Sequence, residues 1–157
     1  MDFPDLSALE DNNQSISYHV EEIDFVFNDI SQKNISKWLS AVAELENNQI
    51  IDLNYIFCSD VFLHKINLDF LNHDTLTDII TFDLGNAEDA FINGEIYISV
   101  DRVRENAIAL DVDFDTELRR VLVHGLLHLI GYPDKTKQES ELMRKQEDKS
   151  LSLYKPV

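Results

Sequence analysis

Apolar residues recur along this chain with two different periods, which predicts a mixture of strands and helices. Residues Ile16–Phe27 alternate between apolar and polar side chains, as in a half-buried strand, and Ile50–Ser59 has the composition of a buried strand. Between them, apolar side chains recur every three or four residues, which predicts a helix with Ser31 as its cap. This helical stripe consists of Ile35, Trp38, Leu39, Val42 and Leu45. We expect Trp38 to lie in the core rather than to stack on a base.

The rest of the chain continues the same alternation. It predicts a short helix at Asp60–Leu71, a strand around Ile79–Thr81, a loop at 85–95 and an antiparallel partner strand at Ile96–Val100. Three more helices are predicted: one at Asp101–Leu110 capped by Asp101, one that ends near Ile130, and one that begins at a capping box of Thr136 and Glu139. These elements predict an α+β fold. We expect a single domain over residues 1–157, with a mixed sheet of about four strands and about five helices.

The stretch Val121–Asp134, VLVHGLLHLIGYPD, is an apolar run that carries two histidines four residues apart. On a helix, His124 and His128 leave the same face one turn apart and can bind one metal ion. Gly131 predicts the end of that helix, after which the chain presents Asp134 as a third ligand. Three protein ligands with one open position are typical of a catalytic metal site. We therefore expect a metal site on this buried C-terminal helix.

A pair of histidines hydrogen-bonded within the core is the alternative explanation. Burial without partners would be unfavourable, because each unsatisfied buried polar group costs roughly 1–3 kcal/mol. A metal ion would remove that cost, so ligation is the interpretation that we favour.

The same motif resembles the signature of the YbeY family, H-G-x-L-H-L-x-G-Y-D-H, the metal-dependent endoribonucleases and rRNA maturation factors. The matching residues are His124, Gly125, Leu127, His128, Leu129, Gly131 and Tyr132. Pro133 and Asp134 stand where the family has Asp and the third ligating His. Leu76–Phe82 (LTDIITF) resembles the family's P-T-D-V-L-S-F, and Gly94–Ser99 (GEIYIS) resembles its G-D-I-x-I. Upstream of these blocks, Leu71 replaces a family arginine.

The resemblance implies one divalent metal ion, zinc first, held by His124, His128 and Asp134. It also places Thr77 and Asp78 in the cleft beside the metal as candidate catalytic residues. A local turn in which Thr77 and Asp78 satisfy nearby backbone groups is an equally good explanation for this pair.

The activity that the resemblance implies is metal-activated hydrolysis or transesterification of an RNA phosphodiester. The substrate would be single-stranded-type rRNA precursor, in rRNA maturation and ribosome quality control, with the small ribosomal subunit as a further partner. A ribosome-assembly factor that binds RNA and carries a structural metal is the first alternative. A zinc peptidase of the H-E-x-x-H type is the second, but its general base would stand at Gly125, which has no side chain.

Composition is that of an ordinary globular protein, with 157 residues, 44% hydrophobic and 27% charged. The single cysteine, Cys58, excludes an internal disulfide and favours a reducing cytoplasm. The acidic N-terminus lacks the features of a signal peptide, and no run of 18 apolar residues exists that would predict a membrane span.

Charge is distributed unevenly along the chain. The net charge of −17 argues against nucleic acid as a partner. However, residues 1–100 carry 3 basic and 19 acidic side chains, whereas residues 101–157 carry 10 basic and 11 acidic ones. The histidine motif therefore lies in the part of the chain where cations gather, and RNA binding remains compatible with the composition.

Overall fold

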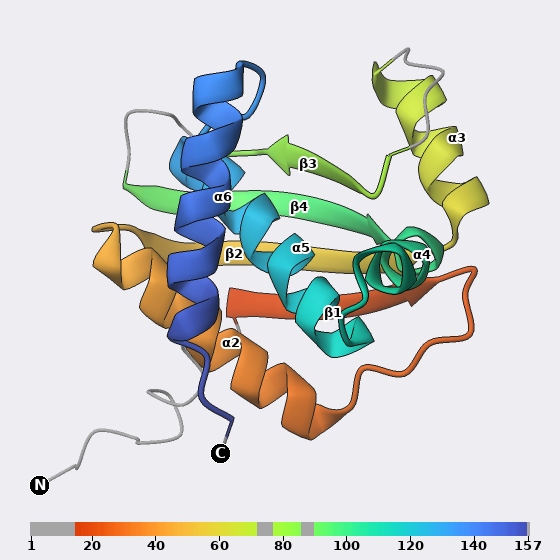
Figure 1. The fold of residues 1–157 in the computed structure, drawn as a ribbon, viewed down its shortest axis with the longest axis horizontal. Coiled ribbons are helices and arrows are strands. Elements are labelled where there is room, and N and C mark those ends of the chain that lie inside the picture. Colours follow the sequence, from red (N-terminus) through yellow and green to blue (C-terminus); the bar gives the residue numbers. More distant parts are fainter. Residues whose placement is uncertain (1–14, 72–76, 86–89, 157) are drawn as a thin grey trace, which may run out of the picture.

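A four-stranded mixed sheet forms the centre of the structure, a computed structural model that describes residues 15–71, 77–85 and 90–156 (Figure 1). The strands are β1 (Ile16–Glu21), β2 (Gln49–Cys58), β3 (Ile79–Asp83) and β4 (Phe91–Ser99). In space their order is β1-β2-β4-β3, with β1, β2 and β4 parallel and β3 antiparallel to β4. The predicted mixed sheet and the antiparallel pair within it are confirmed.

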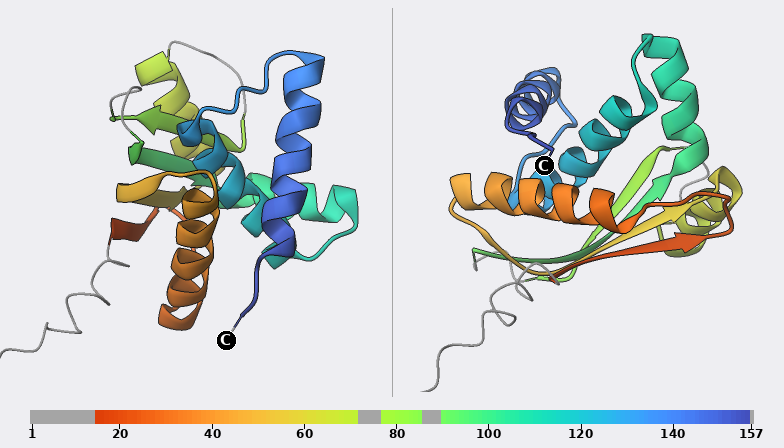
Figure 2. Two further views of the ribbon diagram at one scale, coloured as in Figure 1. Left: turned by 90° about the vertical axis from the view of Figure 1, so that its left-hand side faces the viewer. Right: turned by 90° about the horizontal axis from the view of Figure 1, so that it is seen from below.

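Five helices surround this sheet in the described part of the chain. They are α2 (Asp29–Leu45), α3 (Asp60–Leu71), α4 (Val100–Leu110), α5 (Phe114–Ile130) and α6 (Lys137–Ser152). Figure 2 shows α2 and α5 over one face of the sheet, with α6 packed on the outer side of these two helices. The predicted α+β fold is therefore confirmed. None of the described helices is long and apolar enough to cross a membrane.

The inner face of the sheet holds α5, the helix with the two histidines, in a fixed position. Tyr55 of β2 and Ile96 of β4 are fully buried against α5, where Leu122 and Leu126 are equally buried. Each such side chain contributes roughly 1.5–3 kcal/mol on burial. In addition, the Tyr55 hydroxyl donates a hydrogen bond of 2.8 Å to the backbone carbonyl of Leu122. Because of these contacts, α5 is anchored to the sheet along its length.

A second anchor joins α2 to α6. Trp38 is 4% exposed, and its indole Nε1 donates a hydrogen bond of 2.7 Å to the backbone carbonyl of Ser150. Trp38 therefore belongs to the core, as predicted.

Cys58 is also fully buried, and burial raises the pKa of its thiol to about 12.

The first predicted strand is too long. β1 ends at Glu21, and Glu22 has a left-handed φ of 55° that turns the chain away from the sheet. The apolar alternation nevertheless continues, because Phe25 and Phe27 pack their rings on Phe57, each with a centroid distance of 5.0 Å. An extended loop that packs onto the core thus has the same residue pattern as a strand.

Two predicted helix caps are wrong by a few residues. α2 is capped by Asn28, whose side-chain oxygen accepts a hydrogen bond of 2.8 Å from the backbone N–H of Ser31. α4 is capped by Ser99 instead of Asp101. The Asp101 carboxylate instead accepts a hydrogen bond from the backbone N–H of Asp60 at the start of α3. Each substitute cap lies two or three residues upstream, so both helices begin slightly earlier than predicted.

β4 is longer than predicted because Gly94 is a strand residue and not part of a loop. It pairs with Asp83 of β3 in the antiparallel ladder. A side chain at position 94 would lie only 2.8 Å from Leu129 of α5 and from the backbone oxygen of Phe82. The glycine therefore permits close packing of α5 on the sheet.

Gly125 of α5 has the same role, which gives a testable prediction. A Cβ atom there would lie 2.8 Å from Cδ1 of Ile96 and 3.0 Å from Cδ1 of Ile79. Overpacking costs about 1–3 kcal/mol, whereas alanine is favoured over glycine in a helix by about 1 kcal/mol. We therefore expect Gly125→Ala to lower the free energy of unfolding by about 1 kcal/mol in urea titrations.

The matched control is Gly85→Ala. A Cβ at position 85 makes only ordinary contacts, the closest at 3.4 Å to the carboxylate of Asp83. We expect no loss of stability in this variant. A Gly125→Ala protein as stable as the wild type would show that Ile79 and Ile96 move aside at a cost no larger than the helix-propensity gain of about 1 kcal/mol.

Candidate metal centre

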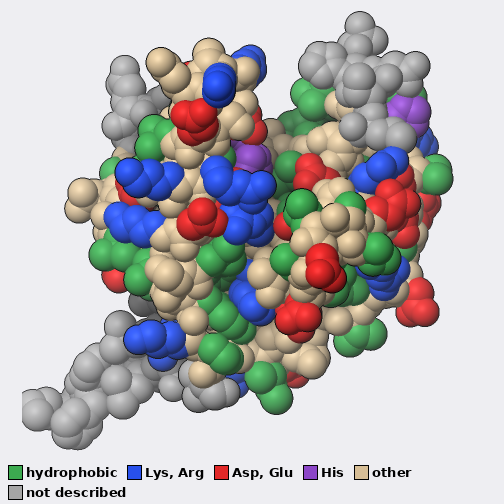
Figure 3. All heavy atoms as spheres, in the orientation of Figure 1, with side chains coloured by type: hydrophobic (Ala, Val, Ile, Leu, Met, Phe, Trp, Pro, Cys, Tyr) green, Lys and Arg blue, Asp and Glu red, His purple; other side chains and the backbone are tan. Residues whose placement is uncertain are grey.

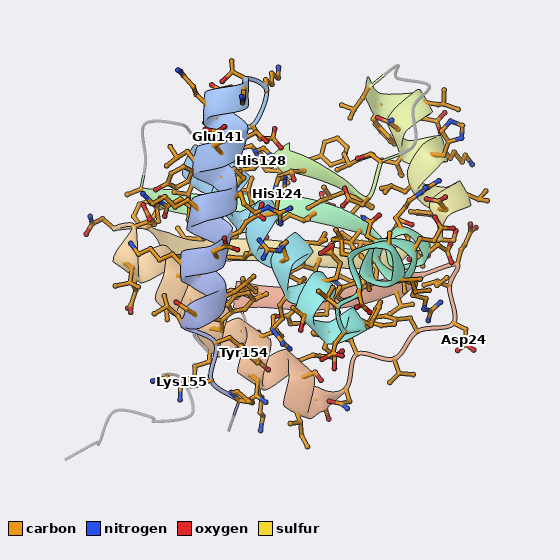
Figure 4. The ribbon with its side chains drawn as sticks, in the orientation of Figure 1. Asp24, His124, His128, Glu141, Tyr154 and Lys155 are labelled. Carbon is orange, nitrogen blue, oxygen red and sulfur yellow. The ribbon has the colours of Figure 1, made fainter. Side chains whose placement is uncertain are left out.

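Helix α5 and the turn after it bring the three predicted ligands together. His124 and His128 lie one turn apart near the C-terminal end of α5, beside α6 (Figure 4). The Nε2 atoms of both histidines lie 3.3 Å from the same atom, Oδ2 of Asp134. Taken as ligand atoms, the three all lie within 4.8 Å of one another. The three residues that the sequence predicts as metal ligands are therefore close neighbours in the fold.

These separations suit a tetrahedral metal ion. Zinc binds imidazole nitrogen and carboxylate oxygen at about 2.0–2.1 Å, which places two tetrahedral ligands about 3.3–3.4 Å apart. Both histidine–aspartate separations, at 3.3 Å, agree with this spacing. Because all three residues line a groove, a fourth coordination position would be accessible from it.

The other ring nitrogen of each histidine is already engaged. Nδ1 of His128 lies 2.9 Å from the backbone carbonyl oxygen of Tyr132, and Nδ1 of His124 lies 2.6 Å from Oε2 of Glu147. A carbonyl oxygen and an ionised carboxylate can only accept hydrogen bonds, so each Nδ1 carries the proton. Each Nε2 therefore presents a lone pair toward Asp134. Metal-binding histidines are commonly oriented in this way.

Three electron-rich atoms thus face one another, which favours a cation between them. Burial lowers the pKa of His124, but the hydrogen bond and charge of Glu147, together with the charge of Asp134, outweigh burial and raise it. A proton is therefore bound more tightly at this position than in a free imidazole. A divalent metal ion would satisfy the same donors more completely, and the residues present fit such an ion.

The turn that carries Asp134 is fixed at both ends. Gly131 ends α5 with a φ of 124°, a conformation that side chains rarely adopt, as predicted from the sequence. At the other end, Thr136 and Glu139 form the predicted capping box of α6. The hydroxyl of Tyr132 donates a hydrogen bond of 3.0 Å to Glu46 at the end of α2. These contacts restrict the position of the Asp134 carboxylate.

Glu147 of α6 is a residue of the site that the sequence analysis did not nominate. Its side chain is only 7% exposed, and besides His124 it contacts Arg120, whose Nη1 donates a hydrogen bond of 2.9 Å. Burial alone would raise the pKa of Glu147, but these two partners outweigh it and hold the pKa below its usual value. One signal was available in the sequence. Glu147 lies four residues after the buried Met143 on the inner stripe of α6, where a carboxylate requires a partner.

A groove of about 910 Å³ contains the three candidate ligands. Figure 3 shows a hollow between α6 and the pair α3 and α4, with a purple histidine inside it. Besides the three ligands, residues from α3, β3, α4, α5 and α6 line the groove, among them Leu71, Thr77, Asp78, Leu110, Glu117 and Arg144. Burial raises the pKa of Glu117 and of Asp78, although the charge of His124 opposes the shift at Asp78.

Thr77 and Asp78 therefore lie in the same groove as the three candidate ligands, at the entry of β3. The Thr77 hydroxyl donates a hydrogen bond of 3.2 Å to the backbone carbonyl of Ile79, which is the local role that the sequence allowed. The backbone carbonyl of Asp78 accepts a hydrogen bond from the backbone N–H of Ser99 at the end of β4. A catalytic role for either residue stays a prediction. The first residue of the LTDIITF block, Leu76, lies outside the described residues.

The match to a family model covers almost the whole of the described chain. The model described as Endoribonuclease YbeY matches residues 16–155. The chain belongs to the YbeY family. The resemblance of the histidine motif is thereby confirmed, and with it the class of enzyme to which the family belongs.

Relatives with the name Endoribonuclease YbeY are about half identical to this chain. The protein from Christiangramia forsetii is 49% identical over 135 residues, which cover 85% of this chain and 90% of the relative. The one from Cytophaga hutchinsonii is 50% identical over 141 residues, or 86% and 98% of the two chains. The one from Amoebophilus asiaticus is 52% identical over 134 residues, or 85% and 88%.

The fold is also similar to a solved structure. The solution structure of TM1509 from Thermotoga maritima superimposes with a TM-score of 0.61 at 28% sequence identity, and 88% of each chain is covered. The zinc peptidase alternative is not favoured by these relationships. The geometry disfavours it as well, because Gly125 packs against Ile79 and Ile96 of the sheet, where a general base could not reach the groove.

Proposed function

We propose that this YbeY-family protein is a metal-dependent endoribonuclease whose metal ion is held by His124, His128 and Asp134. The observation that carries the proposal is the convergence of two imidazole Nε2 atoms on Oδ2 of Asp134, with both Nδ1 atoms held from behind. The relatives named as endoribonucleases supply the class of reaction. RNA is therefore the proposed substrate.

When bound, a divalent metal would act as a Lewis acid on a phosphoryl oxygen or lower the pKa of a water molecule toward 7. We propose zinc, since two imidazoles and a carboxylate are common zinc ligands. A carboxylate in place of a third imidazole makes the site harder, which moves its relative preference toward iron or manganese.

The residues of this chain have separate roles in the proposal. Glu147 and the Tyr132 carbonyl orient the two imidazoles, while the open groove admits the scissile phosphate. Asp78 is proposed as the groove carboxylate that contacts the reacting group, and Thr77 as the residue that shapes the entry of β3 around it.

In the cell, we propose that the substrate is an rRNA precursor and that cleavage serves rRNA maturation and ribosome quality control in the cytoplasm. The small ribosomal subunit is the proposed further partner. Support for this setting comes from the family resemblance.

A cleavage assay with metal removal tests the proposal. A labelled single-stranded RNA is incubated with purified protein as isolated, after EDTA treatment, and after reconstitution with zinc or manganese, while circular dichroism follows the fold. We expect cleavage to be lost in EDTA and restored by metal, with the helical signal retained. Unfolding in EDTA, together with no cleavage under any metal, would instead favour an assembly factor with a structural metal.

A further inference from the structure

Helix α6 and the turn before it present two cations to the groove that no carboxylate holds closely. Arg144 lines the groove with its side chain 57% exposed, and its nearest ion-pair contact is Glu147 at 3.7 Å. That carboxylate is already occupied by shorter contacts to His124 and Arg120. Lys135 also lines the groove, is exposed, and forms no ion pair with any described residue. Both cations are therefore available to a ligand in the groove.

The other arginines of the described chain are engaged elsewhere. Arg102 pairs with Asp60 at 3.1 Å, Arg104 donates to a backbone carbonyl, and Arg119 lies over the ring of Tyr154. Arg120 lines the groove but donates to Glu147 and Asp148 at 2.9 and 2.8 Å. Arg144 is thus the arginine at the site that a phosphate could bind without breaking a close ion pair.

The opposite wall of the groove has a different chemistry. Its described residues from α3 and α4 are Asn67, Leu71, Asn106 and Leu110, none of which is charged. Leu71 is 40% exposed and Leu110 is 54% exposed, so two apolar side chains are accessible on this wall. The α6 side of the groove thus carries Arg144 and Lys135 beside the carboxylates of Glu147 and Asp134, whereas the described α3 and α4 residues are neutral. Asp78, Asp83 and Glu117 also line the groove, so these two cations mark the part of it where a phosphate can bind.

This asymmetry matches the two sides of a single RNA strand. Phosphates need cations, whereas bases accept apolar contact and hydrogen bonds from amides. Residues 1–100 oppose RNA binding, because they carry 19 acidic and only 3 basic side chains. Figure 3 shows Lys and Arg side chains gathered over α6 beside the histidine in the hollow.

We propose that Arg144 and Lys135 bind the phosphates that flank the one at the metal centre. The RNA backbone then follows α6, and its bases face Leu71 and Leu110 on the α3–α4 wall. This inference rests on the proposed function for its ligand, but it makes a separate claim about the direction of the strand across the groove.

The test measures binding of a fluorescein-labelled 12-nucleotide single-stranded 2′-O-methyl RNA to the zinc-loaded protein by anisotropy, and a gel checks that the strand stays intact. Each lost phosphate contact lowers the salt dependence of the affinity by about 0.7 in log–log slope for single strands. We expect the double variant Arg144→Ala/Lys135→Ala to lower that slope by about 1.4, and to weaken binding roughly 10- to 30-fold at 0.1 M salt. Arg144→Lys should restore most of the contribution of Arg144.

Lys145→Ala is the matched control, because Lys145 is an equally exposed cation of α6 that does not line the groove. It should change the affinity by less than about twofold. An abasic strand of the same length separates the two walls. The double variant should weaken binding of both strands equally, whereas Leu110→Ser should weaken only the strand that carries bases.

The outcomes distinguish this inference from the proposed function. Equal affinity and equal salt slope for the wild type and the double variant would overturn the inference, even if the metal-loaded protein cleaves RNA. Wild-type protein that does not bind the strand at low salt would overturn it as well. The proposed function fails on a different result, namely the absence of cleavage by metal-loaded wild type.

Discussion

Replacing His124 or Asp134 by alanine is expected to remove the bound metal ion and to lower RNA cleavage by at least about 10³-fold. Each variant leaves only two of the three converging donors, and a two-ligand site does not hold zinc against solvent. Stabilisation of transition-state charge by a metal ion is worth several kcal/mol, which corresponds to a loss of this size. Asp134→Ala is the sharper variant, since the aspartate stands where the family motif has histidine.

Metal content by mass spectrometry of purified protein measures this directly, with about one equivalent expected in the wild type and almost none in either variant. The control is His19→Ala, an exposed histidine of β1 whose described contact is with Asn54 on the neighbouring strand. It should retain the metal and the activity. An Asp134→Ala protein with a full equivalent of metal would show that another group supplies the third ligand.

The second large effect is expected at Glu147, which contacts no proposed ligand atom of the metal and acts only through His124. Removal of a partner that orients a metal-binding histidine typically lowers metal affinity 10- to 100-fold. Glu147→Ala should fall in this range, because Nδ1 of His124 loses its acceptor at 2.6 Å. Glu147→Gln keeps an oxygen acceptor and should lose less, which is the behaviour of a positioning residue.

Competition with a chromophoric zinc chelator gives the affinity, and a thermal melt of the metal-free protein gives the stability. We expect Glu147→Ala to cost roughly 1–3 kcal/mol, because the half-buried Arg120 loses one of its two carboxylate partners. Glu141→Ala is the control, since Glu141 is exposed on α6 (Figure 4). Unchanged metal affinity in Glu147→Ala would mean that α5 alone orients His124.

The α5 part of the site could be predicted because its geometry is local. A spacing of four residues places His124 and His128 on one helical face, and Gly131 marks the end of the helix without any knowledge of the remaining fold. The Thr136–Glu139 capping box was equally visible, since both of its hydrogen bonds lie within four residues. Asp134 lies between these two local signals and was predicted with them.

Residues that act across the fold could not be predicted in this way. Glu147 is 23 positions from His124, and Arg144 and Leu71 line one groove only because α6 packs beside α5. The end of β1 was missed because Phe25 and Phe27 alternate like strand residues while they pack on Phe57 as a loop. Gly94 was assigned to a loop because the contact that requires a glycine there is made with Leu129, which belongs to another element.

The sequence by itself therefore determined the class of fold, the family, and the three residues that converge on the proposed metal ion. Periodicity, capping and helical spacing are properties of neighbours in the chain, and they survive without tertiary information. Only the tertiary structure decided which side chains surround those residues, including the Arg120–Glu147–His124 chain of contacts and the placement of Arg144 and Lys135 at the groove. The physical reason is that a buried charged side chain is stable only beside a compensating partner. Here those partners come from helices that are far apart in the sequence.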